Sequence, residues 1–595
     1  MHKLMKSKIA LFTIALAFGI NMAADRYEAE NAIVDENSVQ KVADAEASGG
    51  YYVAMKEGAL SFKVNITAAG FYALWARYSQ PFDPNGKIQN LTVNGVSKGQ
   101  ISFPFCSTFV TMKASAKIKL AAGASAIGIA KSWGWVNIDY VELTPYETAP
   151  FSLSAGLVTP NASENARKMY GFLRENFQKK IISGVMTNTV MQNDGKYTPN
   201  TVENQTEAAW INNASGKIPA LIGLDFMHGS GKSSDNEWHK GYTAATIALA
   251  ETVYKRGGFP AYCWHWKDPS KTVETFYSKS SGNSPYTEFN LNRAFVDSTT
   301  CAAFNTSSAE YRAIIVDLDI IAGYLKILAD KNVPVLLRPM HEASGKWFWW
   351  GYSGAKACVA LYKFMFERFT ATHGLNNLIW VWTTDEAGDA PSWYPGDAYV
   401  DIVGRDYYYY PREANHGSLV ASFEKIKEIY GGKKIIALSE NGSIPHPDSL
   451  VGDGAAWSYF MPWYGDYTMD GWAHDNTAAD WKSIMNHAYV ITLDEMPGWE
   501  KYTPAPVNVV RRRRAYNAIS VNQGQGFIEI GLSGANANAV KLYSLQGASV
   551  ATMNKVALGD GIYRMSTKGM ASAIYLLQVI ARSGGALAAR PVMVR

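Results

Sequence analysis

Between residues 155 and 502, short apolar segments of strand length alternate with longer segments that have the periodicity of helices. The helical segments include 165–177 and the amphipathic segment 309–331. The apolar segments are 180–186, 218–226, 259–266, 333–342, 378–385, 400–408, 434–442 and 457–465. Strands that are buried on both faces show such continuous apolar runs. Eight strand–helix units in this order predict a (β/α)₈ barrel.

Ionisable residues end several of the predicted strands. They are His265, Glu342, Asp385, Asp406 and Glu440. A barrel of this kind has its active site at the carboxyl ends of the strands. Loops after strands are often polar, so one such residue indicates little. Five residues at corresponding positions favour an active site at this edge.

Two of these residues form a pair suited to acid–base and nucleophilic chemistry. Glu342 precedes the aromatic run Trp347–Trp350, whose rings can desolvate a carboxyl and raise its pKa, as a general acid requires. Glu440 ends the seventh strand and can remain ionised, and Tyr408 is placed in sequence to donate a hydrogen bond to it. Two carboxyls about 5–5.5 Å apart across a sugar cleave a glycosidic bond with retention. We therefore expect Glu342 to be the acid/base and Glu440 the nucleophile.

The composition agrees with a sugar-binding protein. Aromatic residues make up 13% of the 595 residues, including 18 tryptophans, and the apolar face of a pyranose packs on such rings. The net charge is +4, of which the run Arg511–Arg514 supplies four positive charges. The remainder is near neutral, so we expect no nucleic-acid partner and no anionic membrane surface as partner.

The first 24 residues have the pattern of a secretory signal peptide. Three early lysines precede the apolar stretch 9–20, and small residues lead to Ala24. This predicts cleavage near Ala24 and a secreted or cell-surface protein without a transmembrane segment. The four cysteines lack metal-ligand spacing, and one disulfide with undetermined partners is compatible with an oxidising compartment. They are Cys106, Cys263, Cys301 and Cys358.

Two further β-rich regions flank the barrel. In residues 25–147, short alternating segments separated by turns predict a jelly-roll-like β-sandwich. In residues 515–595, similar segments predict a small β domain. The stretch 503–514 between the barrel and that domain reads as a linker. Its four arginines are either a solvated, cleavable segment or a contact for an anionic group.

The barrel motifs resemble those of glycoside hydrolase family 26, TIM-barrel enzymes dominated by β-mannanases. The resemblance rests on Arg338-Pro-Met-His-Glu342, Trp347-Phe-Trp-Trp-Gly351 and Ser439-Glu-Asn-Gly442, and it spans about residues 155–500. It implies that Glu342 is the acid/base and Glu440 the nucleophile. It implies a substrate-binding role for His265, His341, Trp347, Asp406, Tyr408 and Trp463, with Trp463 as a floor for the sugar.

One departure from the family pattern is visible beside Glu342. Many members read His-Glu-Met-Asn-Gly, whereas this chain reads His341-Glu-Ala-Ser-Gly345. Serine is shorter than asparagine, which puts in doubt any contact made from position 344. The acid/base role does not depend on that residue.

The resemblance implies an endo-acting, retaining β-1,4-mannanase. The expected substrate is a mannan, galactomannan or glucomannan, with no cofactor for catalysis, and we expect a monomer. A second hypothesis keeps the mechanism but changes the substrate to β-1,3-xylan or mixed-linkage β-glucan. A third is a non-catalytic sugar-binding protein on a decayed barrel, which the presence of both Glu342 and Glu440 disfavours.

The N-terminal region resembles a family 35 carbohydrate-binding module. The matching motifs are Tyr27-Glu-Ala-Glu-Asn31, Gly49-Gly-Tyr-Tyr52, Gly70-Phe-Tyr72, Val93-Asn-Gly95 and Trp133-Gly-Trp-Val-Asn-Ile-Asp-Tyr140. The resemblance implies a structural Ca²⁺ held by Glu28, Glu30 and Asp139, because oxygen ligands suit this hard cation. The alternative for Glu28 and Glu30 is an exposed strand edge.

Sugar contacts in this module are expected from Trp133 and Asn137. Trp135 alternates with Trp133, so it is either a further contact or part of the core. The C-terminal region resembles the sorting domains of type IX secretion, through Val540-Lys-Leu-Tyr-Ser-Leu-Gln-Gly547 and the strand 574–579. A small binding or anchoring module would show the same alternation, so both readings stay open.

Overall fold

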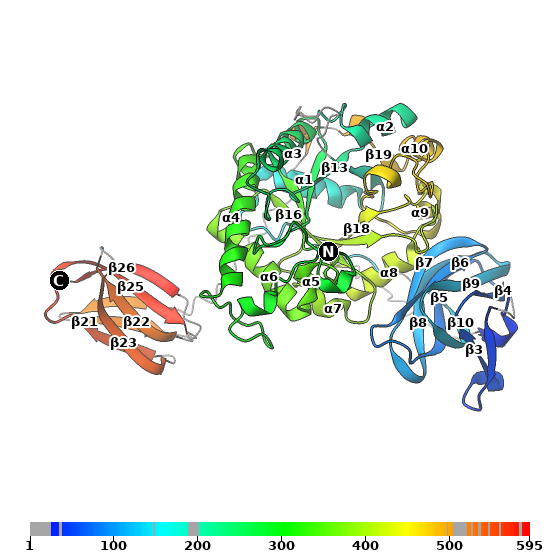
Figure 1. Cartoon of the computed structure of the whole chain (residues 1–595), viewed down its shortest axis with the longest axis horizontal. Coiled ribbons are helices and arrows are strands. Elements are labelled where there is room, and N and C mark those ends of the chain that lie inside the picture. The colour runs from blue at the N-terminus through cyan, green and yellow to red at the C-terminus, as the bar shows by residue number, and fades with distance from the viewer. Residues whose placement is uncertain are drawn as a thin grey trace, which may run out of the picture. The chain divides into compact units, whose positions relative to one another are not determined.

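The computed structural model describes residues 25–34, 38–146, 149–188, 201–496, 498–502, 504, 520–524, 527–532, 537–544, 548–558, 561–581 and 586–594. The predicted signal peptide and the arginines Arg511–Arg514 lie outside the described residues. The chain divides into two compact units. One unit contains the N-terminal region up to Pro150 together with residues 416–428 and 448–455, and the other contains the remaining residues (Figure 1).

The N-terminal unit contains two antiparallel sheets. The first has the order β2 (Gln40–Ala43), β3 (Tyr51–Met55), β10 (Val136–Pro145), β5 (Gly70–Gln80) and β8 (Cys106–Leu120), with β1 (Asp25–Glu28) paired to β10. The second has the order β4 (Ala59–Ile66), β9 (Gly123–Trp133), β6 (Lys87–Val93) and β7 (Val96–Phe103). This confirms the predicted β-sandwich.

Alternation along the strands builds the core of the sandwich. Successive side chains of a strand point to opposite faces, so every second residue of β4 is buried. These buried residues are Leu60, Phe62, Val64 and Ile66. Trp135 does not follow this rule, because it stands just after Gly134, where φ is 89° and the chain turns between β9 and β10. Trp135 is 44% exposed, so of the two readings left open for it, the structure excludes a place in the core.

Residues 416–428 and 448–455 pack with the sandwich through buried charged groups. Lys117 Nζ lies 3.3 Å from Glu424 Oε1, and both side chains are almost fully buried. Tyr146 donates a further hydrogen bond to the other Glu424 oxygen at 3.3 Å. A buried carboxylate needs such partners, because an unpaired charge away from water is costly.

The second unit contains the predicted barrel. Seven parallel strands lie side by side in chain order: β12 (Gly184–Met186), β13 (Leu221–Asp225), β14 (Phe259–Trp264), β15 (Val335–Pro339), β16 (Leu378–Thr384), β17 (Ile402–Tyr407) and β18 (Ile435–Asn441). A short parallel pair, β11 (Ile181–Ile182) and β19 (Val490–Ile491), forms a separate two-stranded sheet, and β11 directly precedes β12 in sequence. All residues of β13, β15, β16 and β18 are buried, as their apolar runs predict.

The eighth strand position is filled by an irregular segment, 457–463, rather than by a regular strand. It joins the two edge strands of the sheet, because Leu438 N of β18 donates to Tyr459 O at 3.0 Å and Met186 N of β12 donates to Pro462 O at 2.9 Å. Pro462 lies in this segment and has no N–H for a regular ladder, although its carbonyl accepts from Met186 N at 2.9 Å. The segment therefore closes the barrel without forming a continuous strand.

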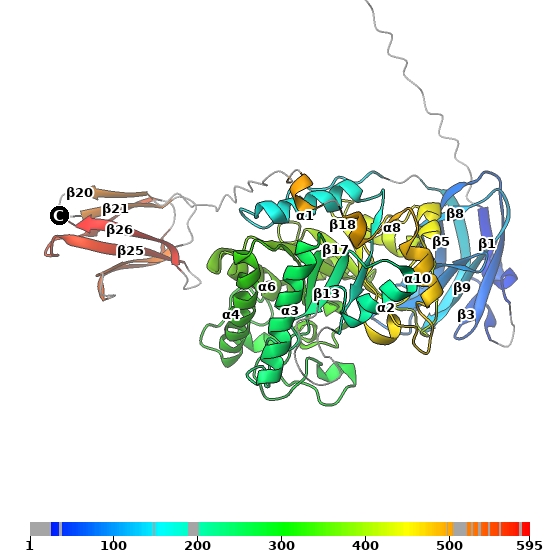
Figure 2. The same cartoon turned by 90° about the horizontal axis from the view of Figure 1, so that it is seen from above.

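The helices of the second unit begin at polar caps. Ser163, Asn236 and Ser308 each accept a hydrogen bond from a backbone N–H in the first turn of the helix that follows. α3 and α4 lie side by side in both views (Figure 1 and Figure 2). The helices are α1 (Glu164–Asn176), α2 (Thr206–Ser215), α3 (Glu237–Lys255), α4 (Ala309–Asp330), α5 (Trp349–Tyr352), α6 (Ala355–Glu367), α7 (Ala390–Trp393) and α10 (Ala478–Met485), with α8 (Val420–Ile429) and α9 (Pro447–Asp453) in or beside the segments assigned to the first unit.

The C-terminal region contains two antiparallel sheets, as predicted. One has the order β20 (Ser520–Gly524), β21 (Phe527–Leu532) and β24 (Gly561–Ser566), and the other has the order β23 (Ser549–Leu558), β22 (Ala537–Tyr543), β25 (Ala573–Ala581) and β26 (Ala586–Val594). Alternate residues such as Ile528, Val540 and Leu577 form their shared core.

All four cysteines are free thiols in the structure. Across the described ranges, none of the helices combines the length and the apolar character needed to cross a membrane.

Candidate active site

Glu342 stands in a tight turn directly after β15. Three residues of this turn have positive φ: Met340 (54°), Glu342 (52°) and Lys346 (62°). Residues other than glycine rarely adopt this conformation, and it is concentrated at functional sites. Gly345 is required in the same turn, because a Cβ there would lie 1.9 Å from the Trp347 ring. Trp347 thus folds back over the turn, and its Nε1 donates to Glu342 Oε2 at 3.0 Å.

Glu440 ends β18, and hydrogen-bond donors hold both of its oxygens. Tyr408 donates to Oε1 at 2.6 Å, and Arg338 Nη2 donates to Oε2 at 2.6 Å. Arg338 Nη1 also donates to Asp406 Oδ2 at 2.5 Å, so its guanidinium bridges two carboxylates. Ser439 donates to the other Asp406 oxygen at 2.7 Å. Among these donors, Arg338 is charged, and a charged donor forms the strongest hydrogen bonds to an ionised carboxylate.

The three carboxyls of the site lie close together. Oxygens of Glu342, Asp406 and Glu440 are all within 4.8 Å of one another. Burial raises the pKa of Glu342 well above its ordinary value, and the negative charges of Glu440 and Asp406 raise it further. Burial also raises the pKa of Asp406 to about 7, against the effect of Arg338. The site therefore contains a carboxyl that keeps its proton beside one that is paired with a cation.

A chain of hydrogen bonds connects the two histidines to Asp225. His265 Nδ1 lies 2.6 Å from Asp225 Oδ2, and His265 Nε2 lies 3.2 Å from His341 Nε2. Burial and the neighbouring His265 lower the pKa of His341 well below its ordinary value, which favours its neutral form. Asp225 was not predicted from the sequence, although it ends the second strand, and its place at a strand end could have identified it.

Trp463 and Asp385 occupy different places in the site. The Trp463 ring centroid is 5.6 Å from that of His265, and its backbone N donates to Asn441 O at 3.0 Å. Trp463 therefore lies beside the histidines, where a sugar floor is expected. Asp385 accepts a hydrogen bond from Ser344 Oγ at 2.6 Å. Asp385 thus supports the turn that contains Glu342. The donor is Ser344, the residue at which the chain departs from the family pattern.

All the substrate-binding residues predicted in the barrel meet in this region. His265 contacts His341 and Trp463, Glu440 contacts Tyr408, and Glu342 contacts Trp347. Asp406 joins them through Arg338. The structure therefore gathers eight predicted residues around one point: His265, His341, Glu342, Trp347, Asp406, Tyr408, Glu440 and Trp463.

In the sandwich, Glu28 and Glu30 have the features expected of cation ligands. Each has a buried oxygen, Oε2, without a hydrogen-bond partner. A Cβ on Gly49 would lie 2.7 Å from Glu30 Oε1 and 4.0 Å from Glu28 Cδ, so both carboxyls border this glycine. Burial raises the pKa of Glu30, and the charge of Glu28 adds to the effect. Asp139 is buried beside them but accepts from Ser48 N at 2.9 Å and pairs with Arg77.

The predicted sugar contacts of the sandwich lie on different sheets. Trp133, at the end of β9, is 49% exposed, and Lys87 Nζ stands 3.9 Å from its ring centroid. Asn137, on β10, is partly buried and donates to Ser79 Oγ at 3.1 Å. Trp135, for which a sugar contact was one of the two expectations, meets the exposed ring of Phe82 edge to face, with centroids 5.7 Å apart. Phe82 was not predicted from the sequence.

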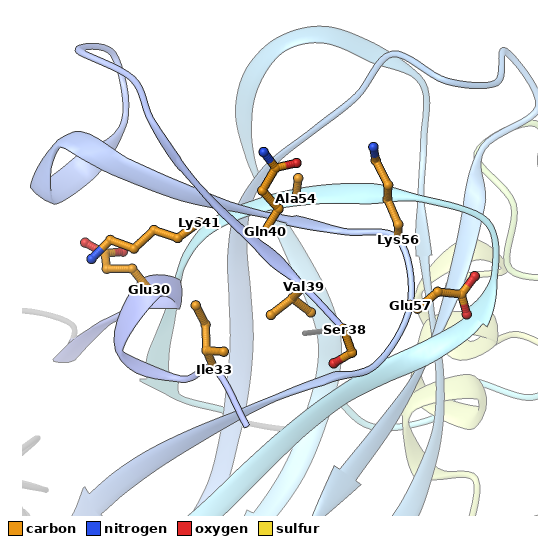
Figure 3. Close-up of a pocket in the computed structure, with 9 residues that line it drawn as sticks. All are labelled: Glu30, Ile33, Ser38, Val39, Gln40, Lys41, Ala54, Lys56 and Glu57. Atoms are coloured by element: carbon orange, nitrogen blue, oxygen red, sulfur yellow. The ribbon is translucent and has the colours of Figure 1, made fainter. Parts of the chain in front are cut away.

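A hollow of about 770 Å³ opens on the sandwich (Figure 3), and Lys56 in its lining has its Nζ 5.3 Å from the Trp135 ring centroid. Four charged side chains line it, namely Glu30, Lys41, Lys56 and Glu57. Figure 3 shows the Glu30 carboxyl beside the end of Lys41, at one side of the hollow. None of the residues that line it is aromatic, so this hollow lacks the flat ring on which a sugar face packs.

Comparisons with known families agree with both resemblances. Residues 158–495 match the family model described as glycosyl hydrolase family 26. Residues 25–146 match the model described as carbohydrate binding module (family 35).

Named relatives match most of the chain. A mannan endo-1,4-beta-mannosidase from Thermothelomyces thermophilus is 32% identical over 489 residues, which cover 80% of this chain and 92% of that protein. Mannan endo-1,4-beta-mannosidase B from a Piromyces species is 32% identical over 501 residues, which cover 82% of this chain and 80% of that protein.

Solved structures are similar to this chain over different shares of its length. The GH26-CBM35 beta-(1,4)-mannanase of Podospora anserina is 31% identical, with a TM-score of 0.51, covering 80% of this chain and 99% of that chain. A beta-mannanase from a symbiotic protist of the termite Reticulitermes speratus is 42% identical, with a TM-score of 0.53, covering 59% of this chain and 100% of that chain. This chain therefore belongs to glycosyl hydrolase family 26, and its N-terminal sandwich is a family 35 carbohydrate binding module.

Proposed function

We propose that this protein is an endo-acting β-1,4-mannanase that hydrolyses mannan-type polysaccharides with retention at the anomeric carbon. The observation that supports retention best is the proximity of Glu342 and Glu440, whose carboxylate oxygens approach within 4.8 Å. Retaining glycosidases have carboxyls about 5–5.5 Å apart, whereas inverting ones leave roughly 6.5–9.5 Å for a water molecule. The named activities of the relatives support the choice of mannan.

In the first step, Glu440 attacks the anomeric carbon while Glu342 gives its proton to the departing glycosidic oxygen. The bond to the leaving sugar breaks, and a covalent glycosyl–Glu440 ester forms. In the second step, Glu342 takes a proton from a water molecule, whose oxygen attacks the same carbon. The ester bond breaks, Glu440 regains its negative charge, and Glu342 regains its proton.

The groups around the two glutamates prepare them for these different roles. Arg338 and Tyr408 hold Glu440 by two hydrogen bonds, which fix the direction of its attacking oxygen. Glu342 receives its hydrogen bond from the neutral Trp347 indole instead, and it borders two other carboxyls. The raised pKa keeps a proton on Glu342 until the leaving oxygen takes it.

A substrate panel tests the proposed activity. Reducing-sugar release from β-1,4-mannan, β-1,3-xylan and mixed-linkage β-glucan should be highest on mannan, and the first product should keep the β configuration in an NMR time course. The variants Glu342→Ala and Glu440→Ala should each lose at least a thousandfold in kcat, because each removes a reacting group. Hydrolysis of xylan or β-glucan instead of mannan would show that the proposed substrate is wrong. An α product would exclude retention.

We also propose that the sandwich binds a structural Ca²⁺ through Glu28 and Glu30. Their two unpartnered buried oxygens suit a hard cation, whereas Asp139 already pairs with Arg77. Calcium should raise the unfolding temperature of the chelator-treated protein, and Glu28→Gln with Glu30→Gln should abolish that rise. An equal calcium response in this double variant would exclude the site.

The exposed Trp133 supports a second role for the sandwich, which is to hold the enzyme on insoluble polysaccharide. Trp133→Ala should reduce retention on insoluble mannan without reducing the rate on soluble oligosaccharides. We further propose that the protein is secreted and monomeric. N-terminal sequencing of protein from the culture medium tests the cleavage near Ala24, and light scattering tests for the mass of a single chain.

A further inference from the structure

Trp472 is an exposed aromatic side chain that the proposed mechanism does not use. It is 71% exposed and stands in the loop 465–476, which follows Trp463. The Arg412 guanidinium lies 4.9 Å from the centroid of the Trp472 ring and 3.7 Å from that of the Tyr467 ring. A guanidinium in contact with two rings holds both by cation–π attraction. The exposed indole is therefore held in place at one side.

Buried polar groups fix the loop that carries Trp472. Arg412 Nε donates to Asp475 Oδ2 at 2.7 Å, and Asp475 is buried. Asn476 accepts from Ile444 N at 2.8 Å and donates to Gly442 O at 2.9 Å. Because Gly442 is the second residue after Glu440, these bonds fasten the loop to the end of the nucleophile strand.

A row of side chains leads from Trp472 to the nucleophile. Tyr467, the other ring in contact with Arg412, has its ring centroid 5.0 Å from that of Tyr408. Tyr408 in turn donates to Glu440 at 2.6 Å. The order outward from the reacting carboxylate is thus Tyr408, Tyr467, Arg412 and Trp472. Trp472 is the last member of this chain of contacts, and it is the exposed one.

We propose that Trp472 forms an outer subsite, on which a sugar of the polysaccharide chain packs outside the subsite next to Glu440. A neutral hexopyranose presents an apolar face that suits an exposed indole. The fixed loop gives this contact a low entropic cost, because the ring is already held before the sugar arrives. This inference rests on the proposed function, since it needs a substrate long enough to reach the loop.

The dependence of the rate on chain length tests the proposal. Wild-type protein and Trp472→Ala are compared on β-1,4-mannohexaose and β-1,4-mannotriose. Loss of one stacked sugar should lower kcat/KM on the hexaose by roughly tenfold, which corresponds to about 1.4 kcal/mol. The rate on the triose should change less than twofold, and the positions at which the hexaose is cleaved should shift. Trp472→Phe keeps a flat ring and should restore most of the hexaose rate.

A matched control removes an exposed ring that lies elsewhere. Phe105, in the sandwich, is half exposed, and Phe105→Ala should leave both rates unchanged. Equal hexaose rates for Trp472→Ala and wild type would overturn the subsite. Equal losses on hexaose and triose would also overturn it, because they would show damage to the catalytic centre. If wild-type protein cleaves neither oligosaccharide, the proposed function fails and the subsite fails with it.

Discussion

Arg338 donates a hydrogen bond to Glu440 at 2.6 Å and, with its other amino group, one to Asp406 at 2.5 Å. The guanidinium thereby gives neighbouring carboxyls different surroundings. Glu440 has a cation beside it, whereas Glu342 has an indole. Side chains of the same type, within 4.8 Å of each other, can then act as nucleophile and as acid.

Replacing Arg338 should therefore damage both stability and activity. In Arg338→Met, Asp406 and Glu440 would remain buried without their cation, which costs about 3–5 kcal/mol of stability. Thermal unfolding should show a lower midpoint, and kcat should fall at least a hundredfold. Arg338→Lys keeps the charge but not the planar fork that reaches both carboxylates, so it should regain stability more than activity. A fully active Arg338→Met protein would contradict this role.

Because its pKa is raised in the folded state, Glu342 should lower the free energy of unfolding near neutral pH. Folded Glu342 keeps its proton at pH values where the unfolded chain has lost it. The folded state therefore loses stability as pH rises from the ordinary pKa of a glutamate to the raised value. Glu342→Gln removes this loss, so the variant should be more stable than wild type, by a margin that widens across that pH window. Unfolding midpoints measured at several pH values give this margin.

A surface glutamate provides the control for that measurement. Glu367, at the end of α6, is exposed, and Glu367→Gln should show a margin that does not widen with pH. The same raised pKa predicts that wild-type activity falls on the alkaline side, as Glu342 loses the proton it must donate. A constant margin for Glu342→Gln from acid to neutral pH would refute the pKa direction.

Asp225 should control the proton positions on both histidines. With its proton on Nδ1, His265 donates a hydrogen bond to the Asp225 carboxylate. His265 Nε2 can then accept a hydrogen bond from His341. In Asp225→Asn, the amide can present an N–H to His265 instead, which favours the opposite tautomer. We expect kcat to fall roughly tenfold to a hundredfold, as it does when a partner that orients a histidine is lost. The pH–rate profile should change shape as well.

Asp317 offers a matched control for Asp225. It is also buried, and it accepts from Trp266 Nε1 at 2.7 Å rather than from a histidine. Burial raises its pKa to about 7, so a neutral amide is a close substitute at that position. Asp317→Asn should retain the wild-type profile. An unchanged profile in Asp225→Asn would show that Asp225 does not set the tautomers.

The barrel and the catalytic pair could be predicted because topology determines where strand ends lie. Each of Glu342, Asp406 and Glu440 follows an apolar run, and parallel strands bring such ends to one edge. The sequence indicated that Arg338 can hydrogen-bond neighbouring carboxyls, but not which two it bridges, because that depends on the direction of its side chain. Trp472 gave no periodic signal, because its loop is polar and irregular. The segment 457–463 has the apolar pattern of a strand. It is irregular in the structure, because Pro462 has no N–H for the backbone hydrogen bonds of a regular strand.

Gly345 should be essential for the position of the acid. A Cβ at this residue would lie 1.9 Å from the Trp347 ring, so Gly345→Ala must displace the indole that donates to Glu342. We expect kcat/KM to fall about tenfold or more, since the hydrogen bond to the acid is lost and a ring proposed to bind substrate moves. Gly323→Ala is the control, because no atom lies within 4 Å of its added Cβ and an alanine in α4 should add up to about 1 kcal/mol of stability. If Gly345→Ala matched Gly323→Ala in kcat/KM, Trp347 would have no part in holding Glu342.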